Sequence, residues 1–378
     1  MTTDSRLKIT DVKSVPLRLV ETVGVMEAAW NPGTSWPRTI GGGSFVEVHT
    51  DQGLVGIGPG VPPGLIPSVR ERLLGEDPFD VERHAHELRY YASGPPYLGT
   101  AGIDIALWDL IGKATGQPLY KLWGGGRDKV IPYASMILLS TPEERAEMAV
   151  KLKEEKWKAI KIRAHFQTIA EDIRLVEAVR EAVGDSMEIM VDGNQAQSSG
   201  TWQPGVQWDF RRAVDTAREL QDLNCYWLEE PLPRFHFDRL AELNNTVEMP
   251  IAGGENNTGL HEFLWMCQEG VYDVLQPESM VLDGVTALRK IGALAEFYGK
   301  QVVPHHGAGD LGVIAHLHLV ASWPHAPFLE LLHDPPIGDY RHAFSIMKEY
   351  PVVEEGLISV PQGPGLGVEI DPDFIERT

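Results

Sequence analysis

Two apolar runs, WKAIKI at residues 157–162 and MEIMVD at residues 187–192, enclose a segment with helical spacing, and this strand–helix–strand unit recurs through the second half of the sequence. The other runs of the same kind are VIPYASM (130–136), CYWLEE (225–230), MPIAGG (249–254), YDVLQP (272–277), KQVVPH (300–305) and PFLELL (327–332). Short strands that alternate with helices in this number are typical of a closed parallel barrel rather than an open sheet. The sequence therefore predicts an α/β barrel.

Most of these predicted strands end in an ionisable residue, where a purely structural strand would end in a small or neutral one. The residues are Lys161, Asp192, Glu229, Glu255, Glu278, His305 and Glu330. In a barrel the carboxyl ends of the strands surround one cavity, and such folds carry their active sites there. Because an unpaired buried charge costs several kcal/mol, we interpret this ring of ionisable groups as functional.

The first third of the chain has a different pattern. Residues 7–20 and 45–58 alternate apolar and polar positions, as half-buried strands do. The stretch 24–44 is rich in Gly, Trp and Pro without a period, which predicts a long loop. Residues 66–92 and 99–122 show helical spacing. An antiparallel sheet followed by helices predicts an α+β module.

These patterns divide the chain into three parts. We expect an α+β capping domain at residues 1–128, a barrel with the functional site at residues 129–345, and a C-terminal segment at residues 346–378. The glycines at 124–126 mark the end of the first part.

Composition excludes several classes of protein. The 378 residues are 43% hydrophobic and 23% charged, which is ordinary for a globular protein. The formal net charge of −21 would repel a phosphate backbone, so we expect no nucleic-acid partner. Two cysteines are too few for a disulfide framework and suggest a reducing cytoplasm. With no signal-peptide core at the N-terminus and no apolar run long enough to span a bilayer, we expect a cytoplasmic protein without a membrane partner.

Three of the strand-end carboxylates form a candidate metal site. Asp192, Glu229 and Glu255 end three successive predicted strands, so their side chains can converge. Hard oxygen ligands favour Mg²⁺, with Mn²⁺ as the alternative. A single such residue would more often be a helix cap, but three on consecutive strands argue for a metal. Glu230 follows Glu229 directly, and alternation predicts that only one of the two faces the cavity.

The motifs at 191–195 (VDGNQ), 227–231 (WLEEP) and 252–256 (AGGEN) resemble the three ligand motifs of the enolase superfamily, mandelate racemase subgroup. The run AGIDIALWDLIGK at 101–113 is similar to the signature helix of that family's capping domain. The resemblance implies a (β/α)7β TIM-like barrel with a capping domain built from the N-terminal region and the C-terminal tail. It also implies that Glu229 is the ligand of the Glu-Glu pair, and that the tail PQGPGLG at 361–367 rejoins the capping domain.

The same resemblance assigns proton-transfer groups. Members of the family abstract the proton next to a carboxylate, and His305 matches their catalytic histidine on the seventh strand. Glu278 matches the carboxylate that orients this histidine, although most relatives carry aspartate there. Glu330 matches a carboxyl group that binds the substrate carboxylate as a protonated acid, and burial would raise its pKa. Asn194 is expected to contact the substrate.

The second strand distinguishes between reaction types. Many relatives carry two lysines here, the second acting as a base, whereas this chain has Lys161 and Arg163. Arginine stays protonated and is a poor base, but it can bind a carboxylate or an enediolate. With His305 as the one convincing base, chemistry on one face of the carbon, and hence a dehydratase, is favoured. His165 is a weaker candidate for a second acid or base, because a loop histidine explains it better.

Two loops are expected to bind the substrate. The segment 196–208 follows Asp192 and carries Trp202 among amides and hydroxyls, a composition that suits a sugar acid. The stretch 24–44 contains Trp36 and Arg38, and in relatives the corresponding loop closes over the substrate.

We therefore predict Mg²⁺-dependent dehydration of an aldonate or aldarate to a 2-keto-3-deoxy acid by a homo-oligomer. A racemase or epimerase is the main alternative, followed by a cycloisomerase. A sugar-acid binding protein without activity is a remote alternative, because a fold does not determine a function.

Overall fold

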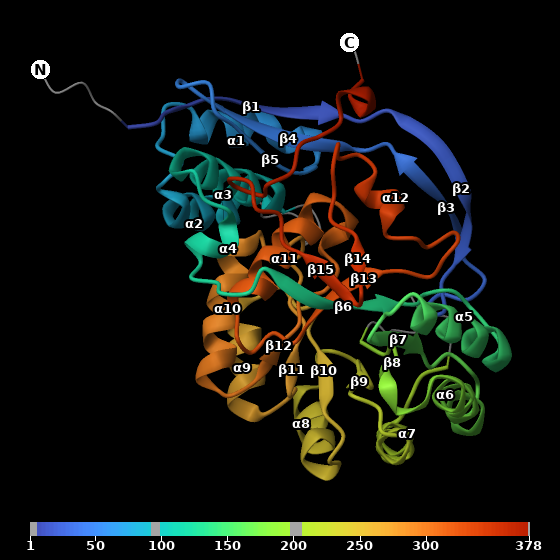
Figure 1. Cartoon of the computed structure of the whole chain (residues 1–378). Helices are drawn as coiled ribbons and strands as arrows, with labels where there is room; N and C mark the ends of the chain where they lie inside the picture. The colour runs from blue at the N-terminus through green and yellow to red at the C-terminus, as the bar shows by residue number, and fades with distance from the viewer. Residues whose placement is uncertain (1–5, 92–98, 197–205, 377–378) are drawn as a thin grey trace, which may run out of the picture.

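The computed structural model describes residues 6–91, 99–196 and 206–376 (Figure 1). Its centre is a parallel barrel whose sheet order follows the chain from β6 to β12. The strands are β6 (Lys129–Ser135), β7 (Ala159–Arg163), β8 (Glu188–Asp192), β9 (Leu228–Glu229), β10 (Ile251–Gly253), β11 (Val274–Leu275), β12 (Gln301–Val302) and β13 (Phe328–Leu332). Because β13 pairs in parallel with β6, the last predicted strand returns to the first. The α/β barrel is confirmed.

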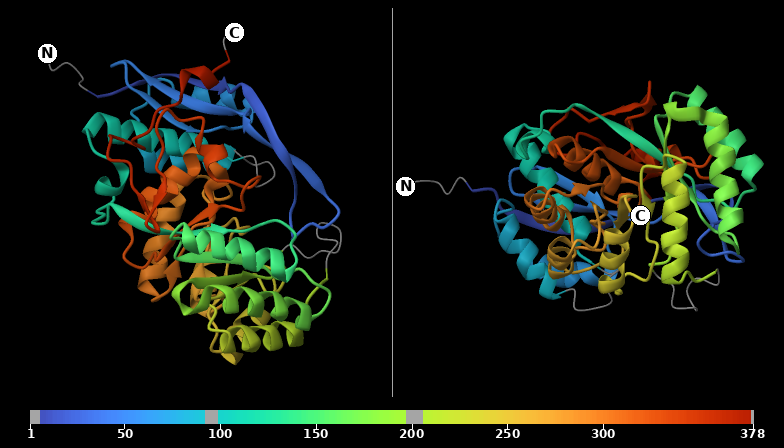
Figure 2. Two further views of the ribbon diagram at one scale, coloured as in Figure 1. Left: turned by 45° about the vertical axis from the view of Figure 1, so that its right-hand side comes forward. Right: turned by 90° about the horizontal axis from the view of Figure 1, so that it is seen from below.

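Helices cover the outside of this barrel, one after each of the strands β6 to β12 (Figure 2). They are α5 (Pro142–Glu154), α6 (Ile169–Val183), α7 (Phe210–Asp222), α8 (Phe237–Thr246), α9 (Leu260–Glu269), α10 (Val285–Phe297) and α11 (Leu311–Ser322). Thr141 and Thr168 begin α5 and α6 with capping boxes, in which a glutamate three residues later returns a hydrogen bond to the cap.

Alternation along the strands explains why charged residues reach the barrel interior. One buried cluster consists of Tyr133, Ala159, Met190, Trp227, Ala252, Val274, Val303 and Phe328. Strand residues two positions apart share a face. The next level toward the carboxyl ends therefore consists of Ser135, Lys161, Asp192, Glu229, Gly254, Gln276, His305 and Glu330. A hydrophobic floor thus supports a layer that is mostly polar.

The capping module packs at the edge of the barrel (Figure 1). Its antiparallel sheet has the order β1 (Ile9–Pro16), β4 (Ser44–Thr50), β5 (Val55–Pro59). Its helices are α1 (Ile66–Leu73), α2 (Val81–Tyr91), α3 (Ala101–Thr115) and α4 (Leu119–Leu122). Helix α3 contacts β5 so closely that a Cβ atom on Gly58 would lie 2.0 Å from the carbonyl oxygen of Gly102.

The prediction of a long loop at 24–44 is wrong. Strands β2 (Leu19–Glu27) and β3 (Ser35–Gly41) pair as an antiparallel hairpin that curves away from the capping sheet and over the barrel (Figure 1). Most β2 residues are exposed, and irregularities interrupt its register. A ribbon with both faces partly in solvent lacks the apolar alternation from which strands are recognised.

The C-terminal segment contacts both parts of the molecule. Strand β15 (Leu357–Ser359) pairs with β14 (Val353–Glu354) and with barrel strand β6. Farther on, Gly365 bridges to Pro118, and Ile375 bridges to Leu17. The remaining elements are α12 (Arg341–Phe344) and the short 3-10 helices Pro63–Leu65, Gly184–Ser186, Gly307–Gly309 and Pro372–Phe374. We retain the division at residues 128 and 345 as a proposal.

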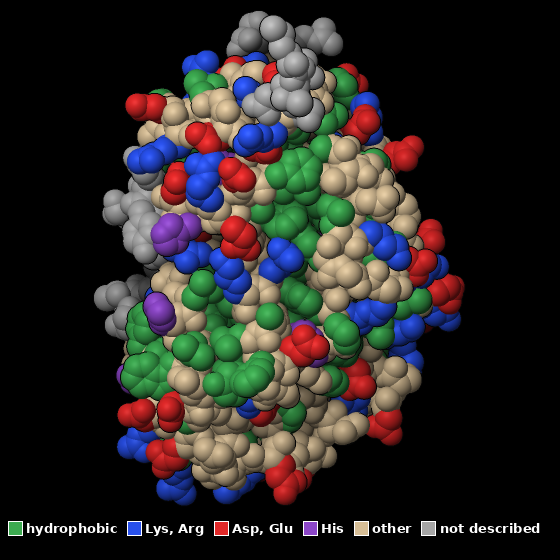
Figure 3. Space-filling model, turned by 90° about the vertical axis from the view of Figure 1, so that its left-hand side faces the viewer, with side chains coloured by type: hydrophobic (Ala, Val, Ile, Leu, Met, Phe, Trp, Pro, Cys, Tyr) green, Lys and Arg blue, Asp and Glu red, His purple; other side chains and the backbone are tan. Residues whose placement is uncertain are grey.

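Acidic and basic side chains are interspersed on the face that lies at the left of Figure 1 (Figure 3). Among the described residues, no helix has the length and apolar character that a bilayer span requires.

Candidate active site

A cavity of about 300 Å³ lies between the β2–β3 hairpin and the carboxyl ends of the barrel strands. Its walls are formed by Met26, Trp30, Trp36, Arg38, Ile137, Arg163, Asn194, Glu230, Glu255, Asn256, His305, His306 and Leu332. Several predicted site residues therefore share one space.

The hairpin contributes the cover of this cavity. Trp36 and Arg38 line it together with Trp30, whose ring centroid lies 6.1 Å from that of Trp36. The Nε atom of Arg38 is buried without a hydrogen-bond partner. Substrate binding by Trp36 and Arg38 stays a prediction, and Trp202 lies outside the described residues.

The predicted metal ligands come from adjacent strands. Asp192 and Glu229 are register partners on β8 and β9, and both are fully enclosed. Oε1 of Glu229 lies 2.6 Å from Nζ of Lys161, and its Oε2 accepts from Gln276 at 2.7 Å. Glu255 follows β10 and lines the cavity.

One glutamate of the pair lines the cavity, as expected, but it is Glu230 and not Glu229. Glu230 has a φ of 45°, a left-handed conformation that breaks the alternation of the strand. It lines the cavity, while Glu229 lies deeper against Lys161. Burial, followed by the charges of Glu255 and Asp192, raises the pKa of Glu230 well above its ordinary value.

The three predicted ligands offer hard carboxylate oxygens, but within the described part of the chain the group whose ligand atoms lie within 4.8 Å of one another is Glu278, His305 and His306. Burial, followed by the charge of Glu229, raises the pKa of Asp192 well above its ordinary value, although Arg163 and Lys161 oppose the rise. Carboxylate oxygens are the ligands that Mg²⁺ and Mn²⁺ prefer. The assignment of Asp192, Glu229 and Glu255 as ligands stays a proposal.

Lys161 connects two carboxylates. Its Nζ atom lies 2.6 Å from Oε1 of Glu229 and 3.0 Å from Oε1 of Glu330. Burial opposes the charge of Lys161, but Glu229 and Glu330 outweigh it and raise the pKa. The expected rise in the pKa of Glu330 is wrong: burial raises it, but Lys161 and His305 hold it well below the ordinary value. Glu330 is therefore ionised.

Arg163 is buried beside the first of the predicted ligands. Its guanidinium forms an ion pair with Asp192, donates to the hydroxyl of Ser135 at 2.8 Å, and lies 5.3 Å from the ring of Trp30. Burial opposes its charge, but Asp192 outweighs it and raises the pKa of Arg163. Asn194 donates to Asp192 at 3.0 Å and also lines the cavity.

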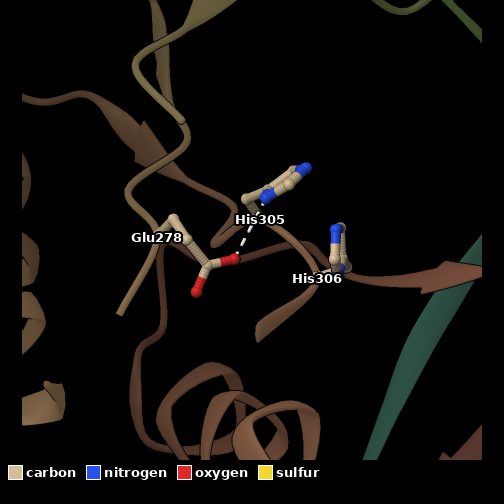
Figure 4. A group of neighbouring side chains, drawn as sticks. All are labelled: Glu278, His305 and His306. Carbon is tan, nitrogen blue, oxygen red and sulfur yellow. Dashed lines mark hydrogen bonds and ion pairs between the residues drawn. The ribbon is translucent and has the colours of Figure 1, made fainter. Parts of the chain in front are cut away.

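His305 and Glu278 form the expected pair (Figure 4). Nδ1 of His305 lies 3.0 Å from Oε2 of Glu278, which also accepts from the backbone N–H of Gly307 at 2.8 Å. The longer side chain of glutamate therefore reaches the histidine. Burial lowers the pKa of His305, but Glu255, Glu330 and Glu278 outweigh it and raise the pKa to about 10.

His306 follows His305 in the chain. It lines the cavity beside His305, with ring centroids 4.1 Å apart. Glu278, His305 and His306 offer ligand atoms within 4.8 Å of one another. However, Glu278 already accepts from His305, whereas His306 stands apart from this bond (Figure 4). We interpret the group as a proton-transfer pair with a neighbouring histidine rather than a metal site.

His165 lines a small cavity next to Phe166, which shares Trp30 and Asn194 with the main cavity but does not include His305. Burial lowers its pKa to about 4, and its Nε2 atom has no partner. Among residues that line the main cavity, Trp30 and Glu230 were not predicted. The tryptophan in the glycine-rich stretch was itself a signal for Trp30. The sequence contains no signal for the backbone conformation of Glu230.

Two family models match the chain. The enolase C-terminal domain-like model covers residues 143–374, and the model for the N-terminal domain of mandelate racemase and muconate lactonizing enzyme covers residues 24–124. The chain thus belongs to the enolase superfamily, in its mandelate racemase and muconate lactonizing enzyme family.

Relatives of known activity narrow the reaction class. An arabinonate dehydratase of Saccharolobus solfataricus is 30% identical over 88% of this chain and 89% of its own length. A D-galactarolactone cycloisomerase of Agrobacterium fabrum is also 30% identical over the same shares. The L-talarate/galactarate dehydratase structure from Salmonella typhimurium, liganded with Mg and L-lyxarohydroxamate, superposes with a TM-score of 0.80 at 27% identity, covering 99% of this chain and 93% of that chain. The chain is therefore an enzyme that catalyses a carbon–oxygen lyase reaction or an isomerisation.

Proposed function

We propose that the protein dehydrates a sugar acid, an aldonate or aldarate, to a 2-keto-3-deoxy acid with the help of Mg²⁺. The observation that carries this proposal is the placement of His305, paired with Glu278, in the same cavity as Glu255 and Arg163. The cavity offers a base and a permanent cation around a space of about 300 Å³, which is in the range of small-molecule sites.

The proposed ligands of Mg²⁺ are Asp192, Glu229 and Glu255, with Mn²⁺ as the alternative ion. When bound, the cation would stabilise the negative charge that develops on the substrate carboxylate. Once Glu255 shares its charge with a cation, the largest of the attractions that hold a proton on His305 is lost. The imidazole can then act as a base near neutral pH.

In the proposed reaction, Nε2 of His305 takes the proton next to the carboxylate while Glu278 stabilises the resulting imidazolium through Nδ1. The electron pair of the broken C–H bond forms a C=C bond, and the β-hydroxyl leaves as water after receiving a proton from His305 or another acid. The enol product then rearranges to the keto acid. Lys161, ion-paired with Glu229 and Glu330, offsets part of their negative charge.

Arg163 supports dehydration over racemisation. A racemase needs a proton acceptor on each face of the carbon, and arginine does not give up its proton. Its ion pair with Asp192 and its hydrogen bond to Ser135 suit a fixed electrostatic clamp. Cycloisomerisation is the second candidate, because the relatives include cycloisomerases and that reaction also begins with a single proton abstraction.

The test is a screen of aldonic and aldaric acids and their lactones with Mg²⁺. Formation of a 2-keto acid supports dehydration. Solvent deuterium in recovered substrate without a keto acid supports epimerisation. Conversion of a lactone to an isomer, with no solvent deuterium at carbons outside the reaction, supports cycloisomerisation. Binding of a sugar acid without any reaction would support a binding protein that has no catalytic activity. We also propose a cytoplasmic homo-oligomer, which light scattering of the purified protein tests for its assembly state.

A further inference from the structure

His316 lies on α11 with its side chain fully enclosed. Its Nδ1 atom lies 2.5 Å from the carbonyl oxygen of His305, and its Nε2 atom lies 2.8 Å from the hydroxyl oxygen of Ser279. Ser279 directly follows Glu278 in the chain. One imidazole ring therefore connects the two segments that carry the proposed catalytic pair.

The partners of His316 determine its tautomer. A carbonyl oxygen only accepts, so Nδ1 of His316 carries the hydrogen and donates it to His305. Burial lowers the pKa of His316, which favours the neutral ring and leaves Nε2 without a hydrogen. Nε2 therefore accepts, and its donor is the hydroxyl of Ser279.

The hydroxyl of Ser279 has one hydrogen and two acceptors within reach. Nε2 of His316 lies 2.8 Å away, whereas Oε1 of Glu278 lies 3.3 Å away. Because the contact with Nε2 of His316 is the shorter one, the hydroxyl of Ser279 donates its hydrogen there. Oε1 of Glu278 accepts instead from the backbone N–H of Met280 at 2.9 Å. The carboxylate of Glu278 thus receives no hydrogen bond from Ser279, and it interacts more strongly with the ring of His305.

We propose that His316 is a positioning residue for the Glu278–His305 pair. His316 engages the hydroxyl of Ser279, which would otherwise donate to Oε1 of Glu278 and weaken Oε2 of the same carboxylate as the acceptor for His305. It also holds the backbone of His305. This inference deepens the proposed function and rests on it only in taking His305 and Glu278 as the catalytic pair. Glutamate has one more rotatable bond to immobilise than aspartate, so support of this kind matters more here.

Helix α11 offers a matched control in His318, which is equally buried. The backbone N–H of Tyr120 lies 3.2 Å from its Nδ1, and its Nε2 lies 3.1 Å from the carbonyl oxygen of Leu366. His318 therefore has the opposite tautomer, with the hydrogen on Nε2. It anchors the capping module and the tail rather than the catalytic pair.

The first measurement is NMR of ¹⁵N-histidine-labelled full-length protein in saturating Mg²⁺. His316 and His318 should give neutral rings of opposite tautomer. The Nδ1–H proton of His305 should lie downfield, because its acceptor is a carboxylate. In His316→Phe the hydroxyl of Ser279 turns to Glu278, so this signal should move upfield. The double variant His316→Phe/Ser279→Ala removes that hydroxyl and should return the signal.

Control variants distinguish this shift of the His305 signal from a general loss of rigidity in the protein. Ser279→Ala alone and His318→Phe should leave the His305 signal in place. An equal shift in Ser279→Ala, or none in His316→Phe, overturns the proposal. If His316→Phe does not fold, two polar variants replace it. A glutamine at 316 extends toward Ser279 and should keep the signal, whereas an asparagine there reaches only the carbonyl of His305 and should not.

A second measurement uses the sugar acid that gives the largest keto-acid signal in the screen. The kcat of His316→Phe should fall about tenfold with KM unchanged within about twofold, because the base is weakened and no substrate contact is lost. The double variant should recover most of this loss, while His316→Phe and His318→Phe lower the melting temperature alike. If no sugar acid reacts, the proposed function fails. The NMR measurement still tests whether His316 positions the Glu278–His305 pair.

Discussion

Nε2 of His305 lies 3.2 Å from Oε2 of Glu255, so the proposed base and a proposed metal ligand meet at one corner of the cavity. Nδ1 of the same ring lies 3.0 Å from Glu278. The imidazole is therefore held between two carboxylates. Occupation of the metal site and the protonation state of the base must be coupled, because both depend on the charge of Glu255.

Replacement of the base should abolish the chemistry while sparing binding. His305→Asn should lower turnover by several orders of magnitude with KM largely retained, since the residue acts in the transition state. Steady-state kinetics with the best sugar acid measure this. His306→Asn is the control from the same cavity and should cost far less. Near-normal turnover of His305→Asn would move the base to another residue.

Metal removal should be reversible. Excess chelator is expected to abolish activity, and Mg²⁺ or Mn²⁺ should restore it. Calorimetric titration with Mg²⁺ should show that Glu229→Gln binds at least about tenfold more weakly than the wild type. Glu230→Gln is the matched control, because the neighbouring side chain lines the cavity. A larger loss in Glu230→Gln than in Glu229→Gln would reassign the ligand.

Variants of Arg163 should show whether the site contains one catalytic base or two. Arg163→Lys keeps one charge but not the fork that serves both Asp192 and Ser135, so turnover should fall. The new lysine can lose its proton and should add slow α-proton exchange on epimers that the wild type ignores. Deuterium incorporation followed by NMR measures this, with Arg163→Met as the control that shows neither activity. Comparable exchange of both epimers by the wild type would contradict the one-base mechanism.

The hairpin arginine should contribute to binding rather than to chemistry. Arg38 has a buried Nε without a partner in the cavity wall, a group that an anionic substrate can satisfy. Arg38→Met should therefore raise KM about tenfold or more with a much smaller change in kcat, because ground-state contact is lost. Trp36→Phe, which keeps an aromatic ring at the same wall, should change KM less. A selective loss of kcat would instead place Arg38 in the chemical step.

Stability should depend on pH through a carboxyl group far from the active site. Asp104 on α3 accepts hydrogen bonds from Thr286, and burial raises its pKa to about 6. The folded state thus holds a proton that the unfolded chain releases near pH 4, so this group destabilises the fold as pH rises from about 4 to 6. The effect should reach about 3 kcal/mol and stay constant at higher pH.

Urea unfolding of the wild type and Asp104→Asn at several pH values isolates this contribution. The stability advantage of the wild type should shrink as pH rises through this window. A difference that is independent of pH would show that Asp104 ionises normally in the folded protein.

Much of the barrel could be predicted because its determinants are local. Each strand lies within a short apolar run, most of these runs have a polar residue at or just beyond the end, and pairing of β13 with β6 follows once eight such runs are recognised. The β2–β3 hairpin could not be predicted, since most of β2 is exposed and its stability comes from pairing with β3. Sequence periodicity reports burial, and a strand without a buried face leaves no such trace.

The sequence by itself determined which chemical groups enter the barrel interior. Alternation along β7, β8 and β9 places Lys161, Asp192 and Glu229 at one level of the barrel interior. Only the tertiary structure decided their electrical states. Lys161 lies between Glu229 and Glu330, and this contact keeps Glu330 ionised where burial alone would have protonated it. Likewise, a left-handed backbone at Glu230 turns that side chain into the cavity. Charge states depend on distances between strands, and those distances exist only after the barrel has closed.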